Sequence, residues 1–133
     1  MRATQILALA APIILGAFAV YAQPAQQSGT RRTNLQRHDL AISGREVIQV
    51  RVELDPGVAF GRHWHPGEEI VYVLEGSLLY ELEGRRPIQL RAGEVLFIPA
   101  GTVHSAKNVG KSAGAELATY IVEKGKPLVV LVK

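Results

Sequence analysis

Hydrophobic and polar residues alternate along most of the chain after residue 44. Between Arg45 and Leu54, every second residue from Ile48 onward is aliphatic, and the residues in between are polar. This period of two predicts a β-strand with one buried face. Asp55-Pro56-Gly57 ends the strand, because proline has no amide hydrogen for the ladder and glycine accepts a positive φ.

Further short strands follow, and the breaks between nearly all of them contain glycine or proline. No stretch after residue 22 has a convincing helical period. Short strands with such corners predict an all-β domain, either an antiparallel sandwich or a barrel. We expect these strands at residues 58–65, 69–75, 77–82, 87–90, 94–98, 103–108, 115–123 and 127–132.

The first 22 residues have a different pattern. Arg2 is followed by a nearly unbroken apolar run from Ile6 to Val20, which ends in Val20-Tyr21-Ala22. A basic start, an apolar stretch and small residues at the end are typical of a secretory signal peptide. A retained anchor is the alternative, although a membrane-spanning helix needs about 20 apolar residues. We therefore expect residues 1–22 to be a cleaved signal peptide, the protein to be periplasmic or secreted, and no stable membrane anchor to remain.

Residues 23–36 (QPAQQSGTRRTNLQ) are polar and rich in turn formers, with Leu35 as the one large aliphatic residue. Such a segment buries too little apolar area to offset the entropy of ordering. We expect a flexible tether, with the barrel domain at residues 37–133. Arg31 and Arg32 either contact an anionic surface or, more simply, are solvated.

Composition narrows the classes of function. The 133 residues suit one domain, and the net charge of +3 is mild, since domains usually have about 100–200 residues. Basic residues are adjacent only at Arg31-Arg32 and Arg85-Arg86, so we expect no nucleic-acid partner. The absence of cysteine excludes disulfides, iron–sulfur clusters and a cysteine nucleophile. Any metal must be held by histidine nitrogen and carboxylate oxygen.

Three of the four histidines lie beside predicted corners. His63 and His65 are two residues apart, so both imidazoles point to the same face of a strand. Glu69 follows the Pro66-Gly67 break, where a hairpin can bring its carboxylate beside them, and His104 comes after another corner. Three imidazoles and one carboxylate suit Fe, Mn, Co, Ni, Cu or Zn rather than Mg or Ca. The plainer alternative is that these are ordinary surface or core histidines.

Two gapped motifs in this chain resemble those of the cupin family. The first, G-x5-H-x-H-x3,4-E-x6-G, matches the run from Gly57 to Gly76 (GVAFGRHWHPGEEIVYVLEG). The second, G-x5-P-x-G-x2-H-x3-N, matches the run from Gly93 to Asn108 (GEVLFIPAGTVHSAKN). The resemblance covers roughly residues 45–123, and it is strongest to small single-domain bacterial cupins described as quercetin-dioxygenase-like.

The resemblance implies a small β-barrel, or jelly roll, of two antiparallel sheets that holds one divalent transition metal per chain (Fe, Mn, Ni, Co, Cu or Zn). Its implied ligands are His63, His65, Glu69 and His104, with the first three on adjacent strands and His104 on a strand that faces them. The resemblance also suggests a homodimer. The strand at residues 45–54 would otherwise leave an open sheet edge, which proteins tend to cover.

Two functions of different class are consistent with these residues. One is a metal-dependent, dioxygenase-like enzyme that acts on a small chelating substrate, with Glu69 as both ligand and catalytic base, as the resemblance suggests. The other is a non-catalytic module that binds a small ligand or a metal chelate. A lyase would need an additional acid or base, and most of the remaining carboxylates are expected to point outward on strands. Tyr72, Tyr80 and Tyr120 are expected to pack in the barrel, and Arg62 to be solvated.

The signal-peptide assignment leads to a direct prediction. Because the cleavage site is expected after Ala22, mass spectrometry of the exported protein should find its N-terminus at Gln23. A cytoplasmic protein that retains Met1 would contradict the assignment.

Overall fold

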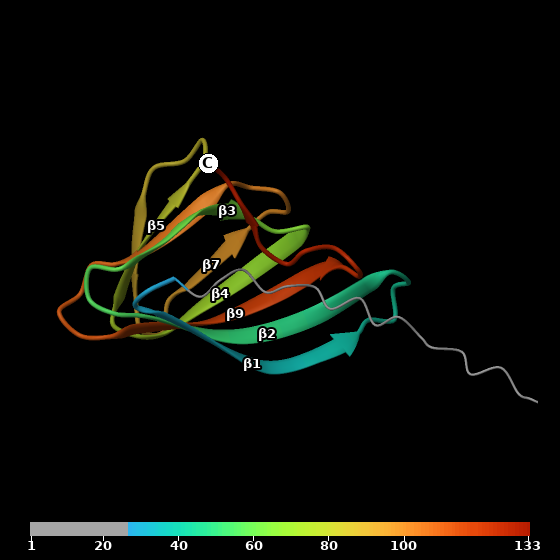
Figure 1. The fold of residues 1–133 in the computed structure, drawn as a ribbon, viewed down its shortest axis with the longest axis horizontal. Helices are drawn as coiled ribbons and strands as arrows, with labels where there is room; N and C mark the ends of the chain where they lie inside the picture. Colours follow the sequence, from blue (N-terminus) through green and yellow to red (C-terminus); the bar gives the residue numbers. More distant parts are fainter. Residues whose placement is uncertain (1–26) are drawn as a thin grey trace, which may run out of the picture.

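Ten β-strands form the part of the chain that the computed structural model describes, residues 27–133 (Figure 1). The expected signal peptide lies outside the described residues. Within residues 27–133, no helix is long and apolar enough to cross a membrane. The strands are β1 (Thr30–Asp39), β2 (Arg45–Leu54), β3 (Ala59–Trp64), β4 (Gly67–Glu75), β5 (Ser77–Leu82), β6 (Ile88–Arg91), β7 (Val95–Ile98), β8 (His104–Asn108), β9 (Gly114–Glu123) and β10 (Val130–Leu131).

The strands form two five-stranded antiparallel sheets that face each other. One sheet has the order β1-β2-β9-β4-β7 and the other β10-β3-β8-β5-β6. Figure 1 shows β1 at the outer edge of the first sheet, beside β2. The sequence therefore predicted the all-β fold of two antiparallel sheets correctly, together with the positions of β2 to β10.

Strict alternation explains why β2 was predictable. Its residues alternate between half-buried and buried along the whole strand. The aliphatic side chains from Ile48 to Leu54 face the interior. There they pack with β9 residues such as Tyr120 and Val122. Burial of one face of each sheet against the other forms the core.

The expected tether is wrong over residues 30–36, which belong to β1. This strand pairs antiparallel with β2 from Thr30↔Leu54 to Asp39↔Glu46, with an irregular register near Leu35. Most β1 side chains are exposed, so the strand has no apolar alternation to detect. Its order comes from the backbone ladder, which does not depend on hydrophobic side chains. Residues 23–26 lie outside the described part of the chain.

β1 also removes one reason for expecting a homodimer. β2 lies between β1 and β9, so the strand at residues 45–54 has no open edge. The argument from that edge is wrong, and the homodimer stays a prediction that rests on family resemblance.

Gly67 is the first residue of β4, just after the chain passes from the sheet of β3 to the other sheet. A Cβ at this position would lie 2.0 Å from the backbone oxygen of Ile121 and 2.7 Å from the Cα of Val122. Only glycine lets β4 approach β9 this closely. The close approach fixes the start of β4 and therefore the position of Glu69, two residues later.

Candidate metal centre

The structure brings together the four side chains that the sequence predicted as metal ligands. One nitrogen from each of His63, His65 and His104 lies within 4.8 Å of the others. The Oε2 atom of Glu69 is 3.2 Å from Nε2 of His65 and 3.0 Å from Nε2 of His104. All four side chains are at most 5% exposed.

The strands that carry these residues are arranged differently from the expectation. β3 pairs with β8, and His63 lies directly opposite His104 within one sheet. Glu69 comes from β4 in the facing sheet. The expectation of three ligands on adjacent strands with His104 opposite them is therefore wrong. The reason is that the corner at Pro66 carries the chain to the other sheet instead of forming a hairpin.

A second contact fixes the two motifs relative to each other. The amide of Gly101 donates a hydrogen bond to the carbonyl of His65, at 3.1 Å. Gly101 has a φ of +70°, a conformation that glycine adopts without strain. The turn before β8 is thereby attached to the end of β3, which places His104 beside His65.

Each imidazole is oriented by a backbone carbonyl. Nδ1 of His63 lies 2.7 Å from the oxygen of Gly61, and Nδ1 of His104 lies 2.8 Å from the oxygen of Thr102. Nδ1 of His65 lies 2.6 Å from the oxygen of Leu128. Because a carbonyl oxygen only accepts, each Nδ1 carries the hydrogen. The lone pairs of the three Nε2 atoms therefore point toward one another and toward Glu69.

This arrangement fits a bound cation. A neutral Nε2 and an ionised carboxylate are both acceptors, so contacts of 3.0–3.2 Å between them require a proton or a metal ion in between. Nε2 of His65 and Oε2 of Glu69 are buried and have no hydrogen-bond donor. Three nitrogens and one oxygen are the donor set of a mononuclear transition-metal site.

Burial and neighbouring charges shift the pKa values of these groups. Burial, with contributions from His104 and His65, lowers the pKa of His63 to about 3. Burial alone would lower the pKa of His104, but protonated His104 can donate a hydrogen bond to Glu69, and this bond and the charge of Glu69 raise the pKa. Burial alone would raise the pKa of Glu69, but the two imidazoles in contact with it hold that pKa below its usual range. The ionised carboxylate of Glu69 and the positive charge of a protonated His104 therefore stabilise each other.

A small cavity of about 10 Å³ is lined by three of the four residues, His63, Glu69 and His104. That volume holds about one water molecule. Besides site residues, it is lined by two groups that sequence reasoning missed, Arg32 from β1 and Glu116 from β9. Tyr80 and Tyr120 also line it. Both tyrosines are buried and pack in the barrel as expected. Their hydroxyl groups also make hydrogen bonds in the interior, with Glu116 and Arg32.

Glu116 is an exception to the expected outward orientation of most remaining carboxylates. It is 7% exposed and accepts a hydrogen bond from the hydroxyl of Tyr80. Burial, with the charge of Glu69, raises the pKa of Glu116 to about 7. Its position could have been found, because Glu116 has the same parity as the inward-facing Ala118 and Tyr120. The carboxyl group of Glu116 is therefore an additional acid–base group in the interior, of the kind that a lyase would need.

The other residues singled out from the sequence lie away from the centre. Tyr72 is 44% exposed on β4, so the expectation that it packs in the barrel is wrong. Arg62 is exposed and lies 3.5 Å from Glu83, as expected for a solvated strand. His38 is exposed on β1.

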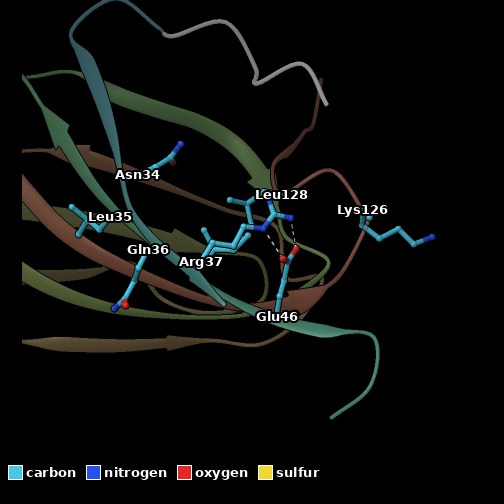
Figure 2. Close-up of a pocket in the computed structure, with 9 residues that line it drawn as sticks. Asn34, Leu35, Gln36, Arg37, Glu46, Lys126 and Leu128 are labelled. Atoms are coloured by element: carbon cyan, nitrogen blue, oxygen red, sulfur yellow. Dashed lines mark hydrogen bonds and ion pairs between the residues drawn. The ribbon is translucent and has the colours of Figure 1, made fainter. Parts of the chain in front are cut away.

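A larger groove of about 260 Å³ lies under β1, apart from the imidazoles. Figure 2 shows Arg37 and Glu46 facing each other in it, joined by two hydrogen bonds of 2.6 Å. Leu128 also lines the groove, and its carbonyl is the one that orients His65. None of the four predicted ligands lines this groove.

Comparisons with known proteins agree with this architecture. Residues 50–131 match the family model of the cupin domain. The chain is 34% identical over 83 residues to the oxalate-binding protein of Thermotoga maritima, covering 62% of this chain and 68% of that protein. It is 31% identical over 85 residues to germin-like protein 1 of Brassica napus, covering 60% of this chain and 41% of that protein.

Solved structures give the same result. An oxalate oxidase superposes with a TM-score of 0.65 and 30% identity, covering 81% of this chain and 57% of that chain. The DMSP lyase DddQ of Ruegeria pomeroyi superposes with a TM-score of 0.58 and 26% identity, covering 65% of this chain and 43% of that chain. The chain thus spans about half the length of these two enzymes.

The carbonyl contacts predict a defined tautomer for each histidine in the centre. In metal-free protein above the pH at which imidazoles titrate, ¹⁵N NMR should show His63, His65 and His104 with the hydrogen on Nδ1. His38 is exposed and serves as the control, with a mixture of tautomers. A hydrogen on Nε2 in any of the three would contradict the described geometry.

Proposed function

Because the chain belongs to the cupin family, whose model matches residues 50–131, we propose that it is a metal-dependent, dioxygenase-like enzyme acting on a small chelating substrate. The observation that carries the proposal is the buried meeting of three Nε2 atoms and one carboxylate oxygen beside a cavity. One divalent transition metal per chain would be held by His63, His65, His104 and Glu69. When bound, such an ion supplies Lewis-acid and redox chemistry.

The residues of the chain have separate roles in this proposal. Three backbone carbonyls hold the imidazoles in the ligating orientation, those of Gly61, Thr102 and Leu128. Hydrogen-bond partners outside the ligand set have the same role in metal sites. Glu69 supplies a negative charge and can accept a proton from the substrate at its carboxylate. The two sheets exclude bulk water from the cavity, which strengthens electrostatic interactions inside it.

The relatives support small-molecule chemistry without specifying the reaction. Their names include an oxalate-binding protein, a 3-hydroxyanthranilate 3,4-dioxygenase from Bos taurus and a dimethylsulfoniopropionate lyase. The chain covers only 19% of the dioxygenase and 28% of the lyase. The small cavity favours a substrate of few atoms over a large aromatic one.

A non-catalytic role is the second candidate, a module that binds a small ligand or a metal chelate. It is favoured by the same cavity, since a volume that holds about one water admits an organic substrate only if a lining side chain moves. We propose that either form acts in the periplasm or outside the cell, following the expected signal peptide.

Metal content tests the ligand set. Replacing His63, His65 or His104 by Ala should lower metal affinity at least about tenfold, because each removes one donor to the ion. Elemental analysis and competition with a chelator would measure the change in protein purified without a His tag. His38→Ala is the matched control and should leave metal content unchanged. Wild-type metal content in His104→Ala would contradict the site.

Glu69→Gln separates the enzyme from the binding module. The substitution keeps the size and one oxygen but removes the charge and the base. Oxygen uptake on a panel of chelating substrates should fall by at least about a hundredfold, far more than metal content falls. Equal losses of metal and activity would show that Glu69 is a ligand alone. No oxygen uptake by metal-loaded wild type on any substrate would favour the binding module.

A further inference from the structure

Arg32 places a positive charge at the cavity beside the metal donors. Its guanidinium carbon lies 5.7 Å from the ring centroid of Phe60 and 5.9 Å from that of Tyr120. One Nη2 hydrogen is donated to the hydroxyl of Tyr120 at 3.3 Å. Phe60, Tyr120 and Arg32 all line the same cavity as His63 and Glu69.

This guanidinium differs from the neighbouring arginines on β1. Arg31 lies 3.1 Å from a carboxylate oxygen of Asp55, and Arg37 lies 2.6 Å from one of Glu46. Within residues 27–133, no carboxylate lies within 4.0 Å of a guanidinium nitrogen of Arg32. Burying a charge costs free energy unless a partner of opposite charge and hydrogen bonds compensate for the lost hydration, and a ligand could supply that partner for Arg32.

The acids around the cavity are already engaged elsewhere. Glu69 faces the imidazoles of His65 and His104. Glu116 accepts a hydrogen bond from the hydroxyl of Tyr80, and the charge of Arg32 acts on Glu116 only from beyond ion-pair distance. A carboxylate from outside the protein would therefore be the complementary partner for Arg32. Guanidinium binds carboxylates through two parallel hydrogen bonds, whereas its faces stack on aromatic rings.

We propose that Arg32 binds the carboxylate of a small anionic substrate whose other end coordinates the metal. This inference rests on the proposed function, because it needs a cation held by His63, His65, His104 and Glu69. It adds the substrate class, a small chelating carboxylate. The proposal also makes β1 part of the site, although the polar sequence of this strand predicted a flexible tether.

Two features of the site favour this substrate class. A cation held by His63, Glu69 and His104 would lie beside the cavity that Arg32 also lines, so an anion in it would be attracted from both ends. The cavity admits a larger ligand only if a lining side chain moves, and Arg32 is held by ring faces and one long hydrogen bond rather than by an ion pair. A carboxylate that replaces the Tyr120 contact gives the guanidinium a charged partner in exchange.

The test compares glycolate with glycolamide, two hydroxyl-bearing chelators of nearly equal size that differ in charge. Isothermal titration calorimetry on metal-loaded protein should find that Arg32→Gln weakens glycolate binding roughly tenfold to a hundredfold, as for loss of charge-assisted hydrogen bonds. Glycolamide binding should change little. Equal glycolate affinity in wild type and Arg32→Gln, or an equal loss for both compounds, would overturn the proposal.

Three further variants act as controls. Arg31→Gln removes a neighbouring, exposed arginine of β1 and should bind glycolate as the wild type does. Glu116→Gln removes an acid that lines the cavity and should bind glycolate at least as tightly. Arg32→Lys keeps the charge without the two-pronged geometry and should show an intermediate loss, which keeps the proposal testable if Arg32→Gln does not fold.

Metal content measured on every sample separates the two proposals. If the variants hold as much metal as the wild type and only Arg32 affects glycolate, both proposals stand. If metal is bound but Arg32 has no effect, the proposed function stands and the role of Arg32 is wrong. If the wild type binds no metal, the proposed function fails, and Arg32-dependent binding of formate to that protein then decides whether a carboxylate site exists without it.

Discussion

Three hydrogen bonds from imidazole Nδ1 atoms to backbone carbonyls determine the chemistry of this barrel. They direct three Nε2 lone pairs toward one carboxylate in a buried space, where like acceptors tolerate each other only with a cation or a proton between them. The carbonyls come from three separate parts of the chain, Gly61 within β3, Thr102 before β8 and Leu128 after β9. The site therefore exists only when both sheets and the segment before β10 are in place.

The non-ligand residues of the two motifs hold this framework together. Asn108 is fully buried; its amide donates to the carbonyls of Leu54 and Ser112, and its side-chain oxygen accepts from the amide of Gly110. These bonds attach the end of β8 to the end of β2 and to the turn before β9. At Gly76, a Cβ would lie 2.8 Å from the backbone of Gly114. The motifs thus combine the candidate ligands with the contacts that position the strands carrying them.

The sequence predicted the fold and the four candidate ligands because both have local signatures. Period-two alternation marks β2, and the fixed spacing of His63, His65 and Glu69 marks the site. The strand pairing was predicted wrongly, because no local pattern shows that the chain changes sheets at Pro66. β1 was missed because its stability comes from backbone pairing with β2. Arg32 was missed with it, since a side chain on an unrecognised strand has no predictable direction.

Glu116 illustrates the opposite case, a residue whose pattern was present in the sequence. Its inward position follows from the alternation of β9, but an acidic residue is normally assigned to the solvent face. The interior tolerates it because Tyr80 donates to it and because its raised pKa lets it hold a proton. Glu116 is thus a buried acid beside the cavity that the candidate ligands His63, Glu69 and His104 also line.

Anomalous diffraction at the absorption edge of a loaded transition metal would test the account most directly. We predict one peak per chain, at bonding distance, about 2.0–2.2 Å, from Nε2 of His63, His65 and His104 and from a carboxylate oxygen of Glu69. A peak at another position, such as the groove that contains Glu46, or no peak in metal-loaded crystals, would contradict the assignment of this centre.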